Sequence, residues 1–157
     1  MKPSAKPTPT RAARRRARPD DLSRVLEQSR TLENLRRAFA EESTLVFRYL
    51  YYASLAQFEG LEQHAQLFRR IAEGGGTSVL GCFDYLKLGG DPDSGITVGG
   101  TFKNLESLLS SETRQYAETY PEMSKTARQE GFPDIAAWFD TLEKLKRSHA
   151  RKLRRLG

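Results

Sequence analysis

Apolar side chains recur every three or four residues in four long stretches of the chain. The stretches span about residues 31–59, 61–88, 101–129 and 132–156. This step places the apolar residues of each stretch along one side of an α-helix. No part of the chain shows the competing alternation of a half-buried strand. The pattern therefore predicts an all-α protein built from four amphipathic helices.

The connections between the stretches indicate how the helices are arranged. Two connections are short, whereas residues 89–100 form a longer segment rich in Gly, Pro and Asp. Short connections join antiparallel neighbours, and one long connection is typical of a crossover in a four-helix bundle. Thr31, followed by Glu33 and Asn34, predicts the N-terminal cap of the first helix. We expect a bundle over residues 23–157 with one long crossover loop.

The N-terminal segment, residues 1–22, differs from the rest of the chain in composition. It contains four prolines, few apolar side chains and seven basic residues against two acidic ones, so it holds most of the net charge of +6. Such a segment cannot bury enough apolar surface to fold, and we expect a disordered tail. Arg14, Arg15 and Arg16 are suited to binding an acidic partner, a polyanion or a shell protein.

Composition also restricts the class of protein. No apolar run approaches the ~20 residues of a membrane span, and no apolar stretch follows the basic N-terminus as in a secretory signal. The single cysteine, Cys82, excludes an intrachain disulfide and the paired Cys-x-x-Cys motifs of a rubredoxin or zinc module. We expect a cytoplasmic protein in which Cys82 is a small core residue.

Four polar residues occupy positions where the apolar stripes require core residues: Glu42, Glu112, Lys146 and His149. Burying a charge is costly unless it is paired or bound to a metal, so we expect these side chains to converge. Di-iron carboxylate bundles place a lone Glu on each of two helices and a Glu-x-x-His motif on each of the other two. Glu42 and Glu112 occupy the lone-Glu positions here.

The two remaining helices lack the Glu-x-x-His motif. The second helix has Gly75-x-x-Ser78 at the corresponding place, and the fourth has Lys146-x-x-His149. A di-iron site needs bridging ligands to hold its ions ~3.5–4 Å apart. The pattern therefore indicates a di-iron bundle in which half of the ligand set has changed.

Residues 31–156 resemble the rubrerythrin family. The resemblance rests on the first-helix sequence Asn34-Leu-Arg-Arg-Ala-Phe-Ala-Glu-Glu-Ser-Thr, the turn Glu59-Gly-Leu-Glu-Gln, the loop Asp91-Pro-Asp-Ser-Gly-Ile-Thr-Val-Gly-Gly-Thr, Glu112 with the run Tyr116-Ala-Glu-Thr-Tyr-Pro-Glu-Met-Ser-Lys-Thr-Ala-Arg-Gln-Glu-Gly-Phe, and Ala137-Trp-Phe-Asp-Thr-Leu-Glu-Lys-Leu-Lys-Arg-Ser-His-Ala. It implies a ferritin-like bundle, a homodimer, and a di-iron oxidoreductase acting on peroxide or oxygen under oxidative stress.

The resemblance also implies metal-ligand positions. Glu42, Glu112 and His149 match ligands of the family, whereas bridging glutamates are implied where Gly75 and Lys146 stand. A histidine ligand is implied at Ser78 and a further carboxylate at Gln115. Glu42, Glu112, Gln115 and His149 are thus the candidate residual metal site, and Gly75 and Ser78 are lost ligand positions.

Two interpretations of the surviving residues remain open. In the first, Lys146 substitutes for the metal by pairing with Glu42 and Glu112, and the chain is a non-catalytic structural, ligand-binding or partner-binding bundle. In the second, Glu112, Gln115 and His149 hold a single weakly bound iron, zinc or manganese ion, with Glu42 contributing. That chain would be a metal-dependent oxidoreductase.

Three consecutive glycines, Gly74–Gly76, interrupt the second predicted helix. Each glycine costs about 1 kcal/mol relative to alanine in a helix interior. The segment either breaks or kinks the helix, or it opens a cavity near Tyr49, Tyr52 and Tyr116 for an organic ligand.

Overall fold

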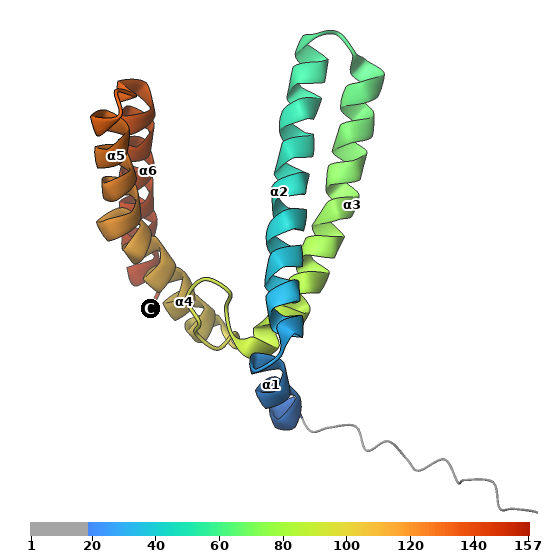
Figure 1. The fold of residues 1–157 in the computed structure, drawn as a ribbon, viewed down its shortest axis with the longest axis vertical. Coiled ribbons are helices and arrows are strands. Elements are labelled where there is room, and N and C mark those ends of the chain that lie inside the picture. The colour runs from blue at the N-terminus through green and yellow to red at the C-terminus, as the bar shows by residue number, and fades with distance from the viewer. Residues whose placement is uncertain (1–18) are drawn as a thin grey trace, which may run out of the picture.

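The computed structural model describes residues 19–157, which form helices and no strand (Figure 1). The all-α class is confirmed. The helices are α1 (Pro19–Glu27), α2 (Arg30–Phe58), α3 (Glu62–Leu86), the short 3₁₀ helix η1 (Lys87–Gly89), α4 (Thr101–Arg114), the π-helix η2 (Gln115–Thr119), α5 (Tyr120–Gln129) and α6 (Pro133–Arg154).

The four predicted helices all form, with ends that differ from the prediction by only a few residues. The third is the continuous run of α4, η2 and α5. The predicted cap of the first helix is wrong by two residues. Ser29 is the N-cap, and its hydroxyl accepts a hydrogen bond from the backbone N–H of Leu32 at 3.4 Å, whereas Thr31 lies within the first turn. Ser is a preferred N-cap residue for this reason.

The π-helical turn η2 precedes Pro121, the second residue of α5. Proline has no backbone N–H, and its ring clashes with the carbonyl four residues earlier, so an undistorted α-helix cannot pass through it. A single widened turn absorbs this mismatch without breaking the helix. The position of Pro121 in the sequence is therefore the feature from which η2 could have been predicted.

Helix α1 begins at Pro19, so the last four residues of the predicted tail are helical. Arg14, Arg15 and Arg16 lie outside the described residues, and the proposed binding role of the tail stays a prediction.

The helices are arranged as two antiparallel hairpins that diverge from a common base (Figure 1). Helix α2 packs along α3 in one hairpin, and α4 and α5 pack along α6 in the other. Helices α1 and η1 lie at the base, against the α2–α3 hairpin. Within residues 19–157, no hydrogen bond, ion pair or aromatic pair joins one hairpin to the other. The predicted four helices are therefore present, but the two halves of the bundle lie apart.

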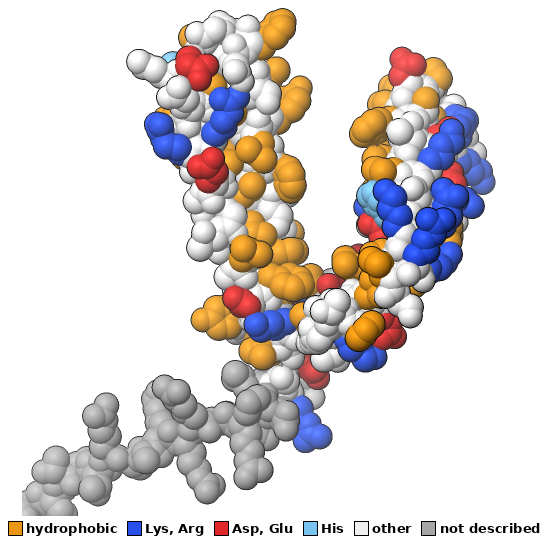
Figure 2. Space-filling model, turned by 180° about the vertical axis from the view of Figure 1, so that it is seen from behind, with side chains coloured by type: hydrophobic (Ala, Val, Ile, Leu, Met, Phe, Trp, Pro, Cys, Tyr) orange, Lys and Arg blue, Asp and Glu red, His pale blue; other side chains and the backbone are white. Residues whose placement is uncertain are grey.

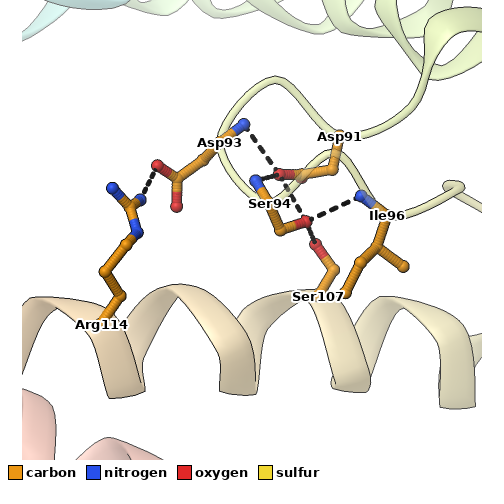
Figure 3. A network of polar contacts seen from close by, with 6 residues as sticks. All are labelled: Asp91, Asp93, Ser94, Ile96, Ser107 and Arg114. Carbon is orange, nitrogen blue, oxygen red and sulfur yellow. Dashed lines mark hydrogen bonds and ion pairs between the residues drawn. The ribbon is translucent and has the colours of Figure 1, made fainter.

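The connection between the hairpins folds back on itself and is tied to α4 (Figure 3). The Asp91 carboxylate accepts hydrogen bonds from the backbone N–H groups of Asp93 at 3.0 Å and Ser94 at 2.8 Å. The Ser94 and Ser107 hydroxyls are 2.6 Å apart, and Asp93 forms an ion pair with Arg114. These bonds fix the start of α4 relative to the loop.

Small residues dominate the buried apolar positions of both hairpins. Seven of the nine are alanines, and the full set is Leu32, Ala53, Ala56, Ala65, Ala72, Leu86, Ala127, Ala136 and Ala150. Many large apolar side chains are exposed, including Leu50, Leu55, Leu67, Ile71, Leu80, Met123, Ile135 and Leu145. Figure 2 shows hydrophobic side chains along the sides of the two hairpins that face each other. Burial of apolar surface is the main driving force of folding, so these faces expose apolar surface of a kind that folded proteins normally bury.

The glycine segment does not break α3. Helix α3 is continuous through Gly74–Gly76. Tyr49 and Tyr52 lie on one hairpin and Tyr116 on the other, so the three do not come together within residues 19–157. At Gly75, an added Cβ would lie 2.8 Å from Cγ2 of Val46, closer than real carbon contacts. Gly75 therefore permits the close approach of α2 and α3.

Alanine substitutions in this segment should separate close packing from helix propensity. Gly74 has open space where a Cβ would be, so Gly74→Ala should stabilise the fold by about 0.5–1 kcal/mol. Gly75→Ala should instead destabilise it by about 1–3 kcal/mol, because the stiff Val46 side chain must move. Urea unfolding followed by circular dichroism at one protein concentration measures both. Val46→Ala should relieve the cost of Gly75→Ala in the double variant; equal effects at Gly74 and Gly75 would contradict the close-packing role.

Candidate polar cluster on the second hairpin

Glu112 on α4 lies between two basic side chains of α6. Its Oε1 atom accepts a hydrogen bond from Lys146 Nζ at 3.2 Å, and its Oε2 atom is 3.3 Å from His149 Nδ1. Lys146 and His149 are three residues apart on α6, which places them on the same helix face. The packing of α4 against α6 brings Glu112 to that face. We call Glu112, Lys146 and His149 the polar cluster.

The polar cluster is shielded from solvent far more than the other lysine–carboxylate pairs. The side chains of Lys146 and Glu112 are 22% and 16% exposed, compared with 62% and 57% for Lys103 and Glu106. An ion pair is stronger where fewer water molecules screen it, and each partner costs more to leave alone there. Lys146 therefore neutralises a carboxylate that would otherwise be poorly solvated.

Two oxygen atoms in this region have no hydrogen-bond donor. Oε2 of Glu112 and Oε1 of Gln115 are buried and unsatisfied within residues 19–157. Gln115 is the first residue of η2, and π-helical turns occur frequently at functional sites. Carboxylate oxygen, amide oxygen and imidazole nitrogen can together bind one divalent cation, although the set is small and an ammonium lies beside it.

A groove of about 260 Å³ opens beside the polar cluster. Its lining residues are Leu108, Glu112, His149, Lys152 and Leu153. Of the two polar-cluster residues that line this groove, His149 is 38% exposed and Glu112 only 16%, so His149 is the more accessible from outside the hairpin.

Glu42 does not join the polar cluster within the chain. It lies half-buried on α2, in the other hairpin. The expected convergence of four polar residues is thus correct for Glu112, Lys146 and His149 and wrong for Glu42. Within residues 19–157, no group of three or more His, Cys, Asp or Glu side chains is placed to hold a metal ion.

Gly75 and Ser78, where the resemblance implies metal ligands, lie on α3 in the same hairpin as Glu42. Gly75 faces Val46, and Ser78 is exposed to solvent. A glutamate at position 75 would need Val46 to shift before its Cβ could be accommodated. Neither position contacts the polar cluster in this chain.

Tyr116 lies in η2 between two arginines of α6. The Arg147 guanidinium is over its ring, 4.9 Å from the centroid, and Arg154 donates a hydrogen bond to its hydroxyl at 3.5 Å. The hydrogen bond from Arg154 is the main cause that lowers the pKa of the Tyr116 phenol below its ordinary value. These contacts attach η2 to α6 beside the polar cluster.

The sequence pattern did not reveal a second polar network that joins α5 to α6. The buried Ser124 hydroxyl donates a hydrogen bond to Asp140 Oδ1 at 2.5 Å and lies 3.1 Å from the Ala136 carbonyl oxygen, and Arg128 forms an ion pair with Asp140. The hydrogen bond from Ser124 is the main cause that lowers the pKa of the Asp140 carboxyl. Ser124 does not belong to the apolar stripe predicted for this helix, so periodicity gave no signal for this network.

Comparison with known proteins decides the family. The model of the Rubrerythrin family matches residues 91–157. The rubrerythrin of Porphyromonas gingivalis is 33% identical over 137 residues, covering 84% of this chain and 68% of the relative. Rubrerythrin-1 of Clostridium acetobutylicum is 32% identical, covering 81% and 69%, and the rubrerythrin of Nitratidesulfovibrio vulgaris is 31% identical with the same coverage. The chain belongs to the rubrerythrin family.

Membership confirms the ferritin-like fold class of this rubrerythrin-family chain. Its helices in residues 19–157 include none that is both long and apolar enough to span a membrane. The polar cluster lies within the matched residues 91–157, whereas Glu42 precedes them.

Replacing Lys146 should destabilise the protein because Glu112 is left without its cation. Lys146→Ala should lower the free energy of unfolding by about 1–3 kcal/mol at neutral pH, the cost of stranding a mostly buried carboxylate. Lys103→Ala removes the partner of a well-exposed carboxylate and should cost at most about 0.5 kcal/mol. Chemical denaturation of the three proteins measures the difference. Equal free energies of unfolding for Lys146→Ala and Lys103→Ala would show that the Lys146–Glu112 pair stabilises the protein no more than an exposed ion pair does.

Proposed function

We propose that this rubrerythrin-family protein is a non-catalytic bundle in which the polar cluster takes the place of a di-iron centre. In this proposal Lys146 supplies the positive charge that iron supplies at a di-iron site, and the protein acts as a structural, ligand-binding or partner-binding module. The reducing cytoplasm is its expected compartment, as inferred from its single cysteine.

The contact between Lys146 and Glu112 carries this proposal. The resemblance implies a bridging glutamate at position 146, opposite Glu112. The lysine there donates a hydrogen bond to Glu112 at 3.2 Å with both side chains largely buried. A cation fixed at this distance opposes a dication in the same space by charge repulsion and already occupies one oxygen of the carboxylate. The interaction therefore supports charge compensation by lysine.

The residues present do not fit a di-iron centre. Two ions held ~3.5–4 Å apart need bridging ligands, and the positions implied for the bridging glutamates are Gly75 and Lys146. Gly75 faces Val46, and Lys146 is itself cationic. We therefore assign no step of peroxide or oxygen chemistry to a di-iron group in this chain.

A single-metal oxidoreductase is the second candidate, and the two unsatisfied oxygens favour it. Oε2 of Glu112 and Oε1 of Gln115 are buried without donors, and His149 lies beside Glu112. These three residues would hold one iron, zinc or manganese ion weakly, and iron or manganese would supply redox chemistry toward peroxide or oxygen. The proteins named rubrerythrin among the relatives make this candidate worth testing.

Iron content distinguishes the two candidates from a conventional di-iron protein. After anaerobic ferrous loading, removal of loosely bound metal and exposure to air, the chain should retain well under two irons and show no absorption of an oxo-bridged pair. Elemental analysis and visible spectroscopy measure both quantities. Binding of two irons per chain would contradict the proposal.

Matched variants separate the first candidate from the second. If one metal binds per chain through Glu112, Gln115 and His149, then Gln115→Ala and His149→Ala should each abolish it, and Ser78→Ala should not. For the lysine-compensated cluster we expect two results. The purified wild-type protein should contain no metal, and its melting temperature should not change when manganese is added.

A further inference from the structure

We propose that the outer face of α6 binds the phosphate backbone of double-stranded nucleic acid. Five basic side chains form this face, which we call the basic face: Lys144, Arg147, Arg151, Arg154 and Arg155. The proposal goes beyond the proposed function and does not depend on it, because no residue of the polar cluster belongs to the basic face.

The basic face lies on the side of α6 that points away from the polar cluster. An α-helix turns by about 100° per residue, so residues about three, four, seven and eleven positions apart share one side. That spacing places the five basic residues together, whereas Lys146 and His149 fall on the opposite side, toward Glu112 of α4. All five basic side chains are exposed, and Figure 2 shows Lys and Arg side chains gathered along the second hairpin.

Tyr116 holds two of these arginines in place. The Arg147 guanidinium lies over its ring, 4.9 Å from the centroid, and Arg154 donates a hydrogen bond to its hydroxyl at 3.5 Å. Arg147 also forms an ion pair with Glu143 at 2.6 Å. Side chains that are held before binding lose less conformational entropy when a ligand arrives. Arg147 and Arg154 therefore form a fixed edge of the basic face.

The other three members carry charge that the protein itself leaves uncompensated. Within residues 19–157, no ion pair joins Lys144, Arg151 or Arg155 to a carboxylate. Residues 144–155 contain seven Lys or Arg and no Asp or Glu. The carboxylates just before them, Asp140 and Glu143, are each paired with an arginine. The basic face is therefore a region of concentrated positive potential, which attracts polyanions.

The helix dipole accounts for only part of this pattern. Basic residues favour the last turn of a helix, where they offset its negative end, and Arg151, Lys152 and Arg154 are placed in that way. The effect falls off within that turn. Lys144 and Arg147 lie about two to three turns before the end of α6 at Arg154. The basic face thus extends further along the helix than the dipole requires.

The chemistry of the basic face favours the phosphates of a duplex. Four of its five members are arginines, whose planar guanidinium groups match pairs of phosphate oxygens. Residues 144–155 contain no Phe, Tyr or Trp, so they offer neither the stacking platform of single-strand binding nor the aromatic anchors of protein interfaces. Duplex DNA carries one charge per about 1.7 Å of its axis, and the basic face extends over about 16 Å, so it can meet several phosphates.

Binding of a labelled DNA duplex of about 20 base pairs, two helical turns, tests the proposal. The face variant removes the three uncompensated charges: Lys144→Gln, Arg151→Gln and Arg155→Gln. The matched control removes one lysine and two arginines from other exposed positions: Lys125→Gln, Arg36→Gln and Arg70→Gln. Both variants keep the basic N-terminal segment. Fluorescence anisotropy measures Kd between about 50 and 200 mM salt, and circular dichroism checks that both variants fold.

The face variant should bind the duplex more than about tenfold more weakly than wild type at low salt. Its plot of log Kd against log salt should be shallower by about 2–3, because each phosphate contact contributes about 0.9 to the slope. The control should change the slope by less than about 1, since charges far from the contact are screened. Equal losses in the two variants, or no loss in the face variant, would overturn the proposal by assigning binding to net charge or to the N-terminal segment.

Competition distinguishes a duplex from other acidic partners. Unlabelled duplex should displace the labelled duplex, whereas polyglutamate and phosphatidylserine vesicles at the same concentration of charges should not. Displacement by polyglutamate would indicate an acidic protein partner, and displacement by vesicles would indicate a membrane surface; either result would contradict the proposal. Stronger competition by an unlabelled single strand of the same length would contradict recognition of the duplex.

Discussion

The Glu112 carboxylate needs a positive partner, and the rest of the site follows from that need. A carboxylate that is mostly removed from water is unstable unless a cation or several donors compensate it. In this chain Lys146 meets one oxygen and His149 approaches the other. A lysine is a fixed monovalent cation on a flexible stem, so it compensates charge but supplies neither an open coordination position nor redox chemistry. The positive charge that faces Glu112 is thus supplied by a side chain of the protein itself.

Both hairpins bury small residues and leave large apolar side chains exposed. The small buried residues allow close packing inside each hairpin, and Gly75 beside Val46 is the clearest case. The large exposed residues form apolar surface of a kind that folded proteins normally bury.

Periodicity predicted the helices well and their mutual arrangement poorly. The stripes located all four helices because the need to bury one face is local to each helix. They also marked Glu112, Lys146 and His149 as inner residues. They could not show that Glu42 lies apart from the other three, since a stripe states which face must be covered and not which helix covers it. The cap at Ser29 and the π-turn before Pro121 depended on local chemistry that periodicity averages out. Glycine content alone left a break at Gly74–Gly76 open, whereas α3 is continuous there.

A double-mutant cycle between Glu112 and Lys146 tests the central claim most directly. The free energies of unfolding of wild type, Glu112→Gln, Lys146→Met and the double variant are compared in the presence of a chelator and again with manganese. The account predicts a favourable coupling of about 1–3 kcal/mol that is the same under both conditions. Additive effects of the two substitutions, or coupling that changes when manganese is supplied, would contradict a cluster compensated by lysine.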